Sequence, residues 1–484
     1  MNTLSTCPTA VAHGRRYSFL VAIGASIGGL LYGYDTGIIA SALLFLREDF
    51  AIADNAFMQS VVTSATLLGA IFGALLTGPL SDRLGRRRTV IVISILFALF
   101  ALGCALATSL NMLIVMRFLL GLGVGGSSQI VPMYIVELAP AHRRGAQGVL
   151  FQMMICVGTL LAYAVGYLLG PSGAWEWMLG LAVIPAVIFI VMMLYLPESP
   201  RWLVGKQQAK RAEEILVRVG RTGHEAAQEV KEIGRLHQDQ QSSWRELFQP
   251  WVRPALVAGL GIAIFSQATG ISAIIYYAPS LLVMAQFGKS VAILGSVGIG
   301  VVLTVFTLLG IWLLDVLGRR RLMLIGLPGA VVVLAVMSML LPWSAHAQEL
   351  LSDGHKIIVL ACLLGYFAFN GGSLSVVTWL YCAEIFPLGV RGKGTALCSF
   401  ALWVVNFLVT LLLYFTFTAD ALGIGLVFGA LAAVNALAWV FVWRYAPETR
   451  GRTLEDIEQS LLNGQFNARN AASSGVLLNK INSD

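Results

Sequence analysis

Long apolar stretches recur along the whole chain, and charged residues gather in the short segments between them. Each stretch has about 20 residues or more, enough for a helix to cross roughly 30 Å of hydrocarbon. Helices are expected because a helix pairs its backbone groups internally, where no water is present to do so. The pattern predicts twelve spans, at residues 19–46, 56–79, 90–108, 111–136, 147–170, 176–196, 254–284, 290–314, 322–342, 355–386, 394–419 and 421–446.

Composition supports a membrane protein. Of the 484 residues, 57% are hydrophobic and only 12% are charged, more apolar surface than a soluble globule could cover. The first, seventh and tenth spans exceed the length that a bilayer needs, so tilt or a helix break is expected there. Residues 1–18 are polar and the first span is too long for a signal sequence, so no cleavable signal peptide is expected.

Three charged motifs occur twice, in the same order. GPLSDRLGRRR (78–88) matches LDVLGRRR (314–321), MYIVELAPAHRRG (133–145) matches LYCAEIFPLGVRG (380–392), and PESPRWL (197–203) matches PETRGRTLE (447–455). The nearly constant offset predicts two six-helix halves of the same orientation. We therefore divide the chain into 1–196 with a polar tail at 1–18, a linker at 197–253, a second half at 254–446 and a tail at 447–484.

The linker 197–253 is the longest polar segment between spans. It contains AKRAEEILVRV at 209–219, whose apolar residues fall on one helical face. This pattern predicts short amphipathic helices beside the membrane rather than a catalytic domain.

Basic residues concentrate in alternate connections. Positively charged loops remain in the cytoplasm, so both termini are expected there, and the net charge of +7 follows from topology. No basic patch interleaved with aromatic residues indicates a nucleic-acid partner. The basic residues of these connections are Arg83, Arg86, Arg87, Arg88, His142, Arg143, Arg144, Arg319, Arg320, Arg321, Arg391 and Lys393.

The repeated motifs place the same acidic and basic set at helix ends in both halves. Opposite charges facing one aqueous layer can join the halves when that side is shut and separate when it opens. The alternative is that they only fix the topology. This candidate gating set comprises Asp82, Arg86, Arg87, Glu137, Arg143, Arg144, Glu198, Asp315, Arg319, Arg320, Glu384, Arg391 and Glu448.

Two charged residues within the predicted spans matter more than those at the span ends. Asp35 falls in GGLLYGYDTGIIA of the first span, and Arg117 falls near the start of the fourth. A charge at membrane depth is costly and usually functional, and each of these residues would favour the other as its partner. The alternative is a static buried ion pair.

No enzyme signature accompanies these features. The chain lacks a GxxxxGK[ST] loop, an HExxH pair and a GxSxG turn between strand and helix. Its six cysteines show no paired spacing, and its histidines are scattered. We therefore expect no cofactor and no metal, and a monomer whose surroundings are the lipid bilayer.

Taken together, these motifs resemble the sugar porter family of the major facilitator superfamily, over nearly all of residues 17–460. The resemblance implies an all-α membrane protein in which two six-helix halves alternate the access of a central site. It implies proton symport of a sugar or sugar-like polyol across the inner (plasma) membrane, with Asp35 as the proton site and Arg117 as its partner. A facilitative carrier of a less hydroxylated solute and a non-transporting nutrient sensor remain alternatives.

The resemblance also implies a sugar site. The positions that match sugar-contacting residues of the family carry Gln152, Gln267, Trp379, Trp403, Tyr276, Tyr277 and Tyr32. Asn406, which lies one turn beyond Trp403, is a further candidate. The chain departs from the family pattern where Ser266 replaces a glutamine and Ser272 replaces an asparagine. Leu303 and Leu402 also stand where amides are frequent. Fewer amides indicate either weak binding of a classical hexose or a cargo with fewer hydroxyls, which could be a pentose, a deoxy sugar, a polyol or a solute other than a sugar.

Overall fold

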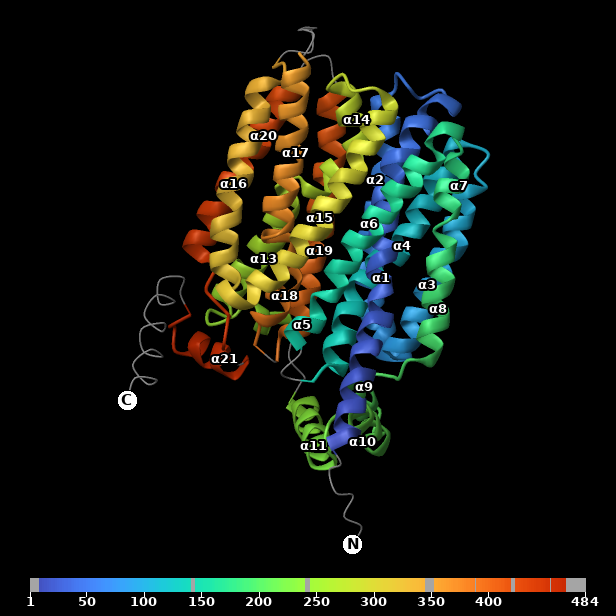
Figure 1. Ribbon diagram of the computed structural model, residues 1–484. Coiled ribbons are helices and arrows are strands. Elements are labelled where there is room, and N and C mark those ends of the chain that lie inside the picture. Colours follow the sequence, from blue (N-terminus) through green and yellow to red (C-terminus); the bar gives the residue numbers. More distant parts are fainter. Residues whose placement is uncertain are drawn as a thin grey trace.

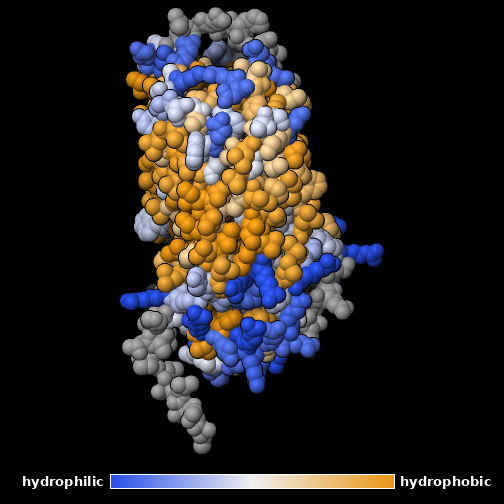
Figure 2. Space-filling view, turned by 90° about the vertical axis from the view of Figure 1, so that its right-hand side faces the viewer, coloured by the Kyte–Doolittle hydropathy of each residue, from blue (hydrophilic) through white to orange (hydrophobic). Residues whose placement is uncertain are grey.

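The computed structural model describes residues 8–140, 144–239, 244–343, 352–387, 389–418, 423–452 and 454–466. Within these residues the regular structure is helical, and no strand is present. Twelve helices or broken helices are long and apolar enough to cross a membrane, which confirms the predicted spans. They run side by side as an elongated bundle (Figure 1). Figure 2 shows a broad hydrophobic band on the outside, between two hydrophilic ends.

Helices α1 to α8 form the N-terminal half of the bundle. Figure 1 shows them, from blue to green, on one side. The first four spans are single helices, whereas the fifth and sixth are each interrupted. The bounds are α1 Pro8–Asp49, α2 Ala56–Leu84, α3 Arg86–Ala105, α4 Leu110–Leu138, α5 Arg144–Gly148, α6 Leu150–Leu169, α7 Trp175–Gly180 and α8 Val183–Tyr195.

Helices α13 to α20 form the C-terminal half on the other side of the bundle (Figure 1). The seventh span consists of α13 and α14, and the tenth of α17 and α18. The bounds are α13 Arg253–Ala268, α14 Ile271–Met284, α15 Lys289–Leu317, α16 Arg319–Leu340, α17 Asp353–Gly371, α18 Leu374–Glu384, α19 Arg391–Thr418 and α20 Ile424–Tyr445.

Two of the three longest spans contain the expected break. The seventh turns at Gly270, whose φ of +89° is accessible to glycine at little cost. The tenth is interrupted between Gly371 and Leu374. The first span differs, because α1 is one continuous helix of 42 residues that already begins at Pro8.

Partners from two other helices satisfy the carbonyl freed at the seventh-span break. The carbonyl of Thr269 accepts hydrogen bonds from the Tyr366 hydroxyl at 2.8 Å and the Asn435 amide at 3.3 Å. The Asn370 amide donates to the Thr269 hydroxyl at 3.2 Å. In hydrocarbon, irregular backbone is tolerated only where the protein supplies such partners.

Glycine lets helices of the N-terminal half approach to backbone contact. A Cβ atom on Gly33 of α1 would lie 1.9 Å from the carbonyl oxygen of Ile155 in α6. A Cβ on Gly69 of α2 would lie equally close to the carbonyl oxygen of Phe118 in α4. Small residues at helix contacts are the usual means of close packing in a membrane.

The predicted amphipathic helices of the linker are present. They lie at the end of the bundle that also carries the arginine motifs (Figure 1), which we call the basic end. The helix α11 begins with a reciprocal cap, in which the Thr222 amide donates to Glu225 at 2.8 Å and lowers the pKa of that carboxyl. The linker helices are α9 Pro200–Gly205, α10 Ala209–Arg218, α11 Gly223–Asp239 and α12 Trp244–Leu247, and α21 Leu454–Leu462 follows the last span.

A buried arginine fastens these helices to the bundle. The guanidinium of Arg221 donates to the carbonyls of Leu138 and Ala139 at the end of α4, both at 2.8 Å. It also pairs with Glu229 of α11 at 3.1 Å. A cation is favourable at a helix C-terminus, where carbonyl groups have no partner within the helix.

Replacing Arg221 with alanine should therefore loosen α10 and α11 while the spans remain folded. Losing these charge-assisted bonds costs on the order of 1–3 kcal/mol, so proteolysis within 223–239 should accelerate about ten-fold. The matched control is Arg211→Ala, because Arg211 is exposed and, among the described residues, its side chain bonds Gln208 alone, at 3.0 Å. Equal cleavage rates in the two variants would contradict the clamp.

Candidate functional site

Asp35 of α1 and Arg117 of α4 meet in the interior of the N-terminal half. Arg117 Nη1 lies 3.3 Å from Asp35 Oδ1, and Arg117 Nε donates to the Val62 carbonyl of α2 at 2.8 Å. Arg117 is fully buried, and 3% of Asp35 is exposed. The two charges predicted from sequence to favour each other are thus partners, and three helices converge on them.

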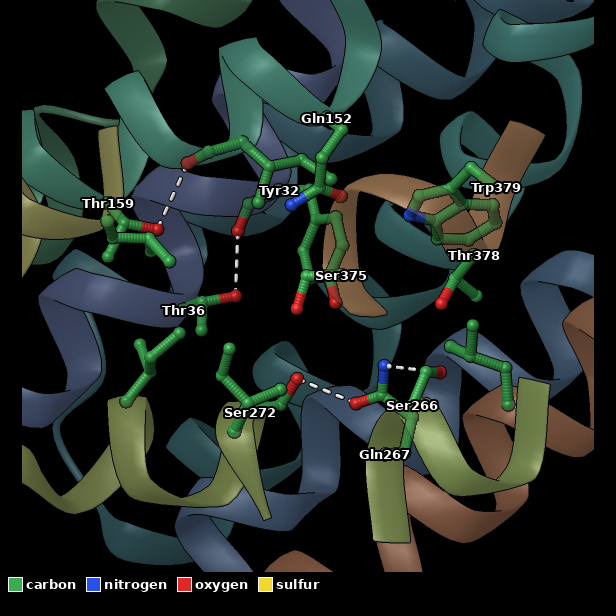
Figure 3. Close-up of a pocket in the computed structure, with 15 residues that line it drawn as sticks. Tyr32, Thr36, Gln152, Thr159, Ser266, Gln267, Ser272, Ser375, Thr378 and Trp379 are labelled. Atoms are coloured by element: carbon green, nitrogen blue, oxygen red, sulfur yellow. Dashed lines mark hydrogen bonds between the residues drawn. The ribbon is translucent and has the colours of Figure 1, made fainter. Parts of the chain in front are cut away.

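A cavity of about 50 Å³ lies between the two halves. Figure 3 shows its lining side chains arriving from α1 and α6 on one side and from α13, α14 and α18 on the other. Six of the residues predicted for the substrate site line it. These are Tyr32, Gln152, Ser266, Gln267, Ser272 and Trp379.

The break of the seventh span gathers three of these residues into one hydrogen-bonded group. Ser272 Oγ donates to Gln267 Oε1 at 2.6 Å, and Gln267 Nε2 donates to Ser266 Oγ at 3.5 Å (Figure 3). The two serines that depart from the family pattern therefore hold the retained glutamine in place. On the opposite wall, the amide of Gln152 makes one long bond, to Cys156 Sγ at 3.7 Å.

Four predicted substrate residues lie behind the cavity wall instead. Trp403 packs on Tyr32 with ring centres 5.2 Å apart, and its indole donates to Ser128 Oγ at 3.0 Å. The Tyr276 hydroxyl lies 3.3 Å from Thr36 Oγ1, and the Tyr277 hydroxyl is 3.4 Å from the Thr410 carbonyl. The fourth is Asn406, whose Oδ1 accepts from the Thr410 hydroxyl at 3.2 Å.

Sequence reasoning missed several lining residues. Leu303 and Leu402, noted for the amides they replace, do reach the cavity. The small hydroxyl residues gave no signal, because serine and threonine are common in membrane helices and bond their own backbone. The breaks of spans seven and ten gave an indirect indication, because the polar groups freed at these breaks border the site. The missed residues are Thr36, Ile155, Thr159, Ile271, Ile275, Ser375 and Thr378.

Contacts between the halves flank the cavity on both sides. Towards the basic end, Phe151 of α6 meets Trp379 of α18 edge to face, with ring centres 5.9 Å apart. Towards the opposite end, the Tyr163 hydroxyl of α6 donates to the Ile275 carbonyl of α14 at 2.7 Å. At that end, Glu48 also pairs with Lys289 across the halves. The cavity is therefore enclosed by contacts between the two halves.

At the basic end, each half carries the same carboxylate cap. Glu198 accepts the backbone N–H groups of Arg86 and Arg87 at 2.8 and 3.1 Å, where α3 begins. Glu448 accepts those of Arg319 and Arg320 at 2.9 and 3.0 Å, where α16 begins. A carboxylate suits the positive end of a helix dipole.

The side-chain pairs of the gating set also repeat. Arg86 lies 3.3 Å from Glu137 in the N-terminal half, and Arg319 forms two bonds to Glu384, at 2.8 and 3.1 Å, in the C-terminal half. In these pairs each arginine meets a carboxylate of its own half. Pairs that join the halves when this end is shut stay a prediction.

The remaining members of the gating set differ in their surroundings. Asp82 bonds Arg86 at 3.2 Å, one turn away on α2, whereas Asp315 is exposed and has no ion pair within the described part of the chain. Arg87 and Arg320 donate instead to backbone carbonyls, those of Met193 and Trp443. Arg391 begins α19. Arg143 lies outside the described residues, and so does the side chain of Arg144.

Comparison with known proteins gives the family. Residues 21–461 match the family described as Sugar (and other) transporter. The chain belongs to this family. It is 39% identical over 443 residues to the glucose transporter GlcP of Staphylococcus epidermidis, covering 92% of this chain and 97% of GlcP. It is 36% identical over 463 residues to the major myo-inositol transporter IolT of Bacillus subtilis, covering 92% and 95%.

A solved structure agrees with the fold. The proton:xylose symporter XylE of E. coli, bound to 6-bromo-6-deoxy-D-glucose, superimposes with a TM-score of 0.79 at 30% identity. The match covers 92% of this chain and 99% of XylE. These findings confirm the predicted major facilitator fold and establish a multi-pass membrane transporter rather than an enzyme.

Proposed function

We propose that this sugar transporter carries a neutral sugar or sugar-like polyol together with protons. The observation that carries the proposal is the buried Asp35–Arg117 pair, 3.3 Å between charged atoms, on the helix that also lines the cavity through Tyr32 and Thr36. A buried acid can bind a proton reversibly, whereas a purely structural polar contact would not need a charge. The proton:xylose symporter XylE and the sugar and inositol transporters above support this cargo.

Coupling follows from the charge of Asp35. Protonation removes the negative charge that holds Arg117 Nη1, so the bond between α1 and α4 weakens. Arg117 retains its bond to the Val62 carbonyl and stays anchored to α2. The proton therefore weakens the attachment of α1 to α4. This change shifts the equilibrium between the two access states.

The size of the cavity supports alternating access. An apolar cavity of roughly 150 Å³ is needed to hold benzene, and this one has about 50 Å³. It therefore has room for water but not for a sugar ring. Contacts between the halves must separate on one side to admit the cargo, as expected for two halves rocking about a central site.

We further propose that the protein acts as a monomer in the bacterial inner (plasma) membrane, with no nucleic-acid partner. The basic end with its linker helices faces the cytoplasm, and so do both termini. The support is the concentration of arginine in the connections of that end, where Arg83, Arg88 and Arg321 are exposed.

A facilitative carrier remains the second candidate. Leu303 and Leu402 in the cavity favour it, because they reduce the number of groups that can bind hydroxyls. The two candidates differ in one property, since only a symporter concentrates its cargo at the expense of a proton gradient.

The repeated charge clusters are proposed as the gate of the basic end. Glu137 and Glu384 each hold an arginine within their own half, and Ser199 and Thr449 donate to the same two carboxylates. These bonds keep the ends of α4 and α18 in fixed positions beside the mouth of the site. We infer that they shape the surfaces that close against each other.

Substituting Asp35 with asparagine should abolish uphill accumulation and preserve exchange, because the side chain keeps its shape but no longer takes up a proton. The measurement is uptake and counterflow of radiolabelled D-glucose, D-xylose and myo-inositol in proteoliposomes with an imposed proton gradient. Asp54→Asn is the control, since Asp54 is an exposed loop carboxylate. Undiminished accumulation by Asp35→Asn would exclude the proton site and favour the facilitative carrier.

Replacing Gln152 or Gln267 with alanine should weaken cargo binding about ten- to a hundred-fold. Each loss leaves a buried hydroxyl of the cargo without a partner, costing roughly 1–3 kcal/mol. Half-saturation of counterflow by the best solute of the panel measures the effect. The control Gln286→Ala changes a glutamine beyond the end of α14 that does not line the cavity. Wild-type affinity in both cavity variants would place the cargo elsewhere.

Exchanging Glu137 for glutamine should favour states open at the basic end. The change weakens the contact with Arg86, and a shift of about 1 kcal/mol alters the equilibrium roughly five-fold. A cavity reporter, Ser375→Cys, would show faster labelling by an impermeant thiol reagent added on that side. The exposed Glu214→Gln serves as the control. If labelling stays constant while the melting temperature falls, the pair stabilises the half without gating it.

A further inference from the structure

The cavity has chemically distinct walls. Its polar lining comes from α1, α6, α13, α14 and α18, whereas α15 and α19 contribute only Leu303 and Leu402. Both leucines are buried, and no charged side chain is among the described residues that line the cavity. A cargo in this space therefore meets hydrogen-bonding groups from five helices and hydrocarbon at Leu303 and at Leu402.

The lining serine and threonine hydroxyls have already used their hydrogens. Each lining serine and threonine hydroxyl donates to an acceptor of the protein itself, over 2.6–3.2 Å, and so offers a cargo only the lone pairs of its oxygen, whereas the Tyr32 hydroxyl can still donate. Ser272 donates to Gln267, and Ser375 donates to Asn370. The other hydroxyls that bond backbone carbonyls are Thr36, Thr159, Ser266 and Thr378.

Donors to the cargo are consequently few. The amide N–H groups of Gln152 and Gln267 donate only over long distances, 3.7 and 3.5 Å, within the described residues. The indole of Trp379 points towards the cavity in Figure 3. Each hydroxyl of a sugar needs an acceptor for its hydrogen and gains from a donor to its oxygen. The polar groups described above can bind the hydroxyls on one part of a cargo. Leu303 and Leu402 offer no hydrogen-bonding group to a hydroxyl that faces them.

The two leucines are held where they are. A Cβ atom on Gly371, at the break of the tenth span, would lie 2.7 Å from a methyl carbon of Leu303. Leu402 precedes Trp403, whose indole is bonded to Ser128 at 3.0 Å. Rotation of either leucine side chain would still leave hydrocarbon facing the cavity. A cargo hydroxyl placed there would lose its water without gaining a partner.

We propose that the preferred cargo is a deoxy sugar, one that carries C–H in place of a hydroxyl where it faces Leu303 and Leu402. This proposal rests on the proposed function, since it names the class of sugar that the same site takes. A site that buries a hydroxyl against hydrocarbon discriminates by about ten- to a hundred-fold. The parent hexose should bind less tightly by that factor.

The test compares D-glucose with 2-deoxy-, 3-deoxy- and 6-deoxy-D-glucose on the purified wild-type protein. The concentration of each sugar that gives half-maximal thermal stabilisation measures its apparent affinity. We expect at least one deoxy analogue to bind about ten-fold more tightly than D-glucose. Leu303→Asn or Leu402→Asn should reduce this preference, while the matched apolar changes Leu303→Ala and Leu402→Ala should keep it.

The outcomes separate the two proposals. D-glucose binding as tightly as every deoxy analogue would overturn the deoxy preference and leave the sugar carrier intact. If none of the four sugars stabilises the protein, the deoxy proposal fails, and the sugar carrier is then decided by the separate counterflow test with D-xylose and myo-inositol. The wild-type ranking decides without the variants, so poor folding of an asparagine variant does not affect the test.

Discussion

Every polar group within the hydrocarbon layer must find its partner inside the protein, because no water is there to supply one. The break at Gly270 is possible because Tyr366 and Asn435 bind the freed carbonyl of Thr269. The same constraint pairs Asp35 with Arg117 and turns the lining hydroxyls towards the protein's own acceptors. The serine and threonine hydroxyls of the cavity are thus satisfied by the protein when the site is empty.

At the basic end the constraint is different, because water is present and helix ends must be defined. Both halves begin a helix in the same way at this end. A glycine with positive φ, Gly85 or Gly318, is followed by a helix whose first N–H groups bind a carboxylate. Those carboxylates, Glu198 and Glu448, come from the ends of the sixth and twelfth spans. Each cap therefore ties the last span of a half to the junction between the second and third spans of that half.

The spans were predictable because length and hydropathy set them directly. The stretch expected at 290–314 is α15, Lys289–Leu317, and the span at 355–386 contains the helices α17 and α18. The partnership of Asp35 and Arg117 was also predictable, since no other charge lies at that depth in the first four spans. The cavity was only partly predictable. Trp403 was assigned to it, but the rotation of α19 presents Leu402 to the cavity. The hydroxyls of Thr159 and Thr378 carry no pattern that distinguishes them from ordinary helix residues.

Coupling between proton and cargo depends on one helix. Tyr32 and Thr36 lie one turn apart on α1 and face the cavity, whereas Asp35 lies on another face of the same turn and points to Arg117. The helix is continuous there, so its two faces cannot shift independently. A change in the bond to Arg117 must therefore alter the position of Tyr32 and Thr36 against the cargo. Thr36 also contacts Tyr276 of α14, so the same displacement reaches the other half. In the proposed symport, a proton on Asp35 would thus act on the site without touching the cargo.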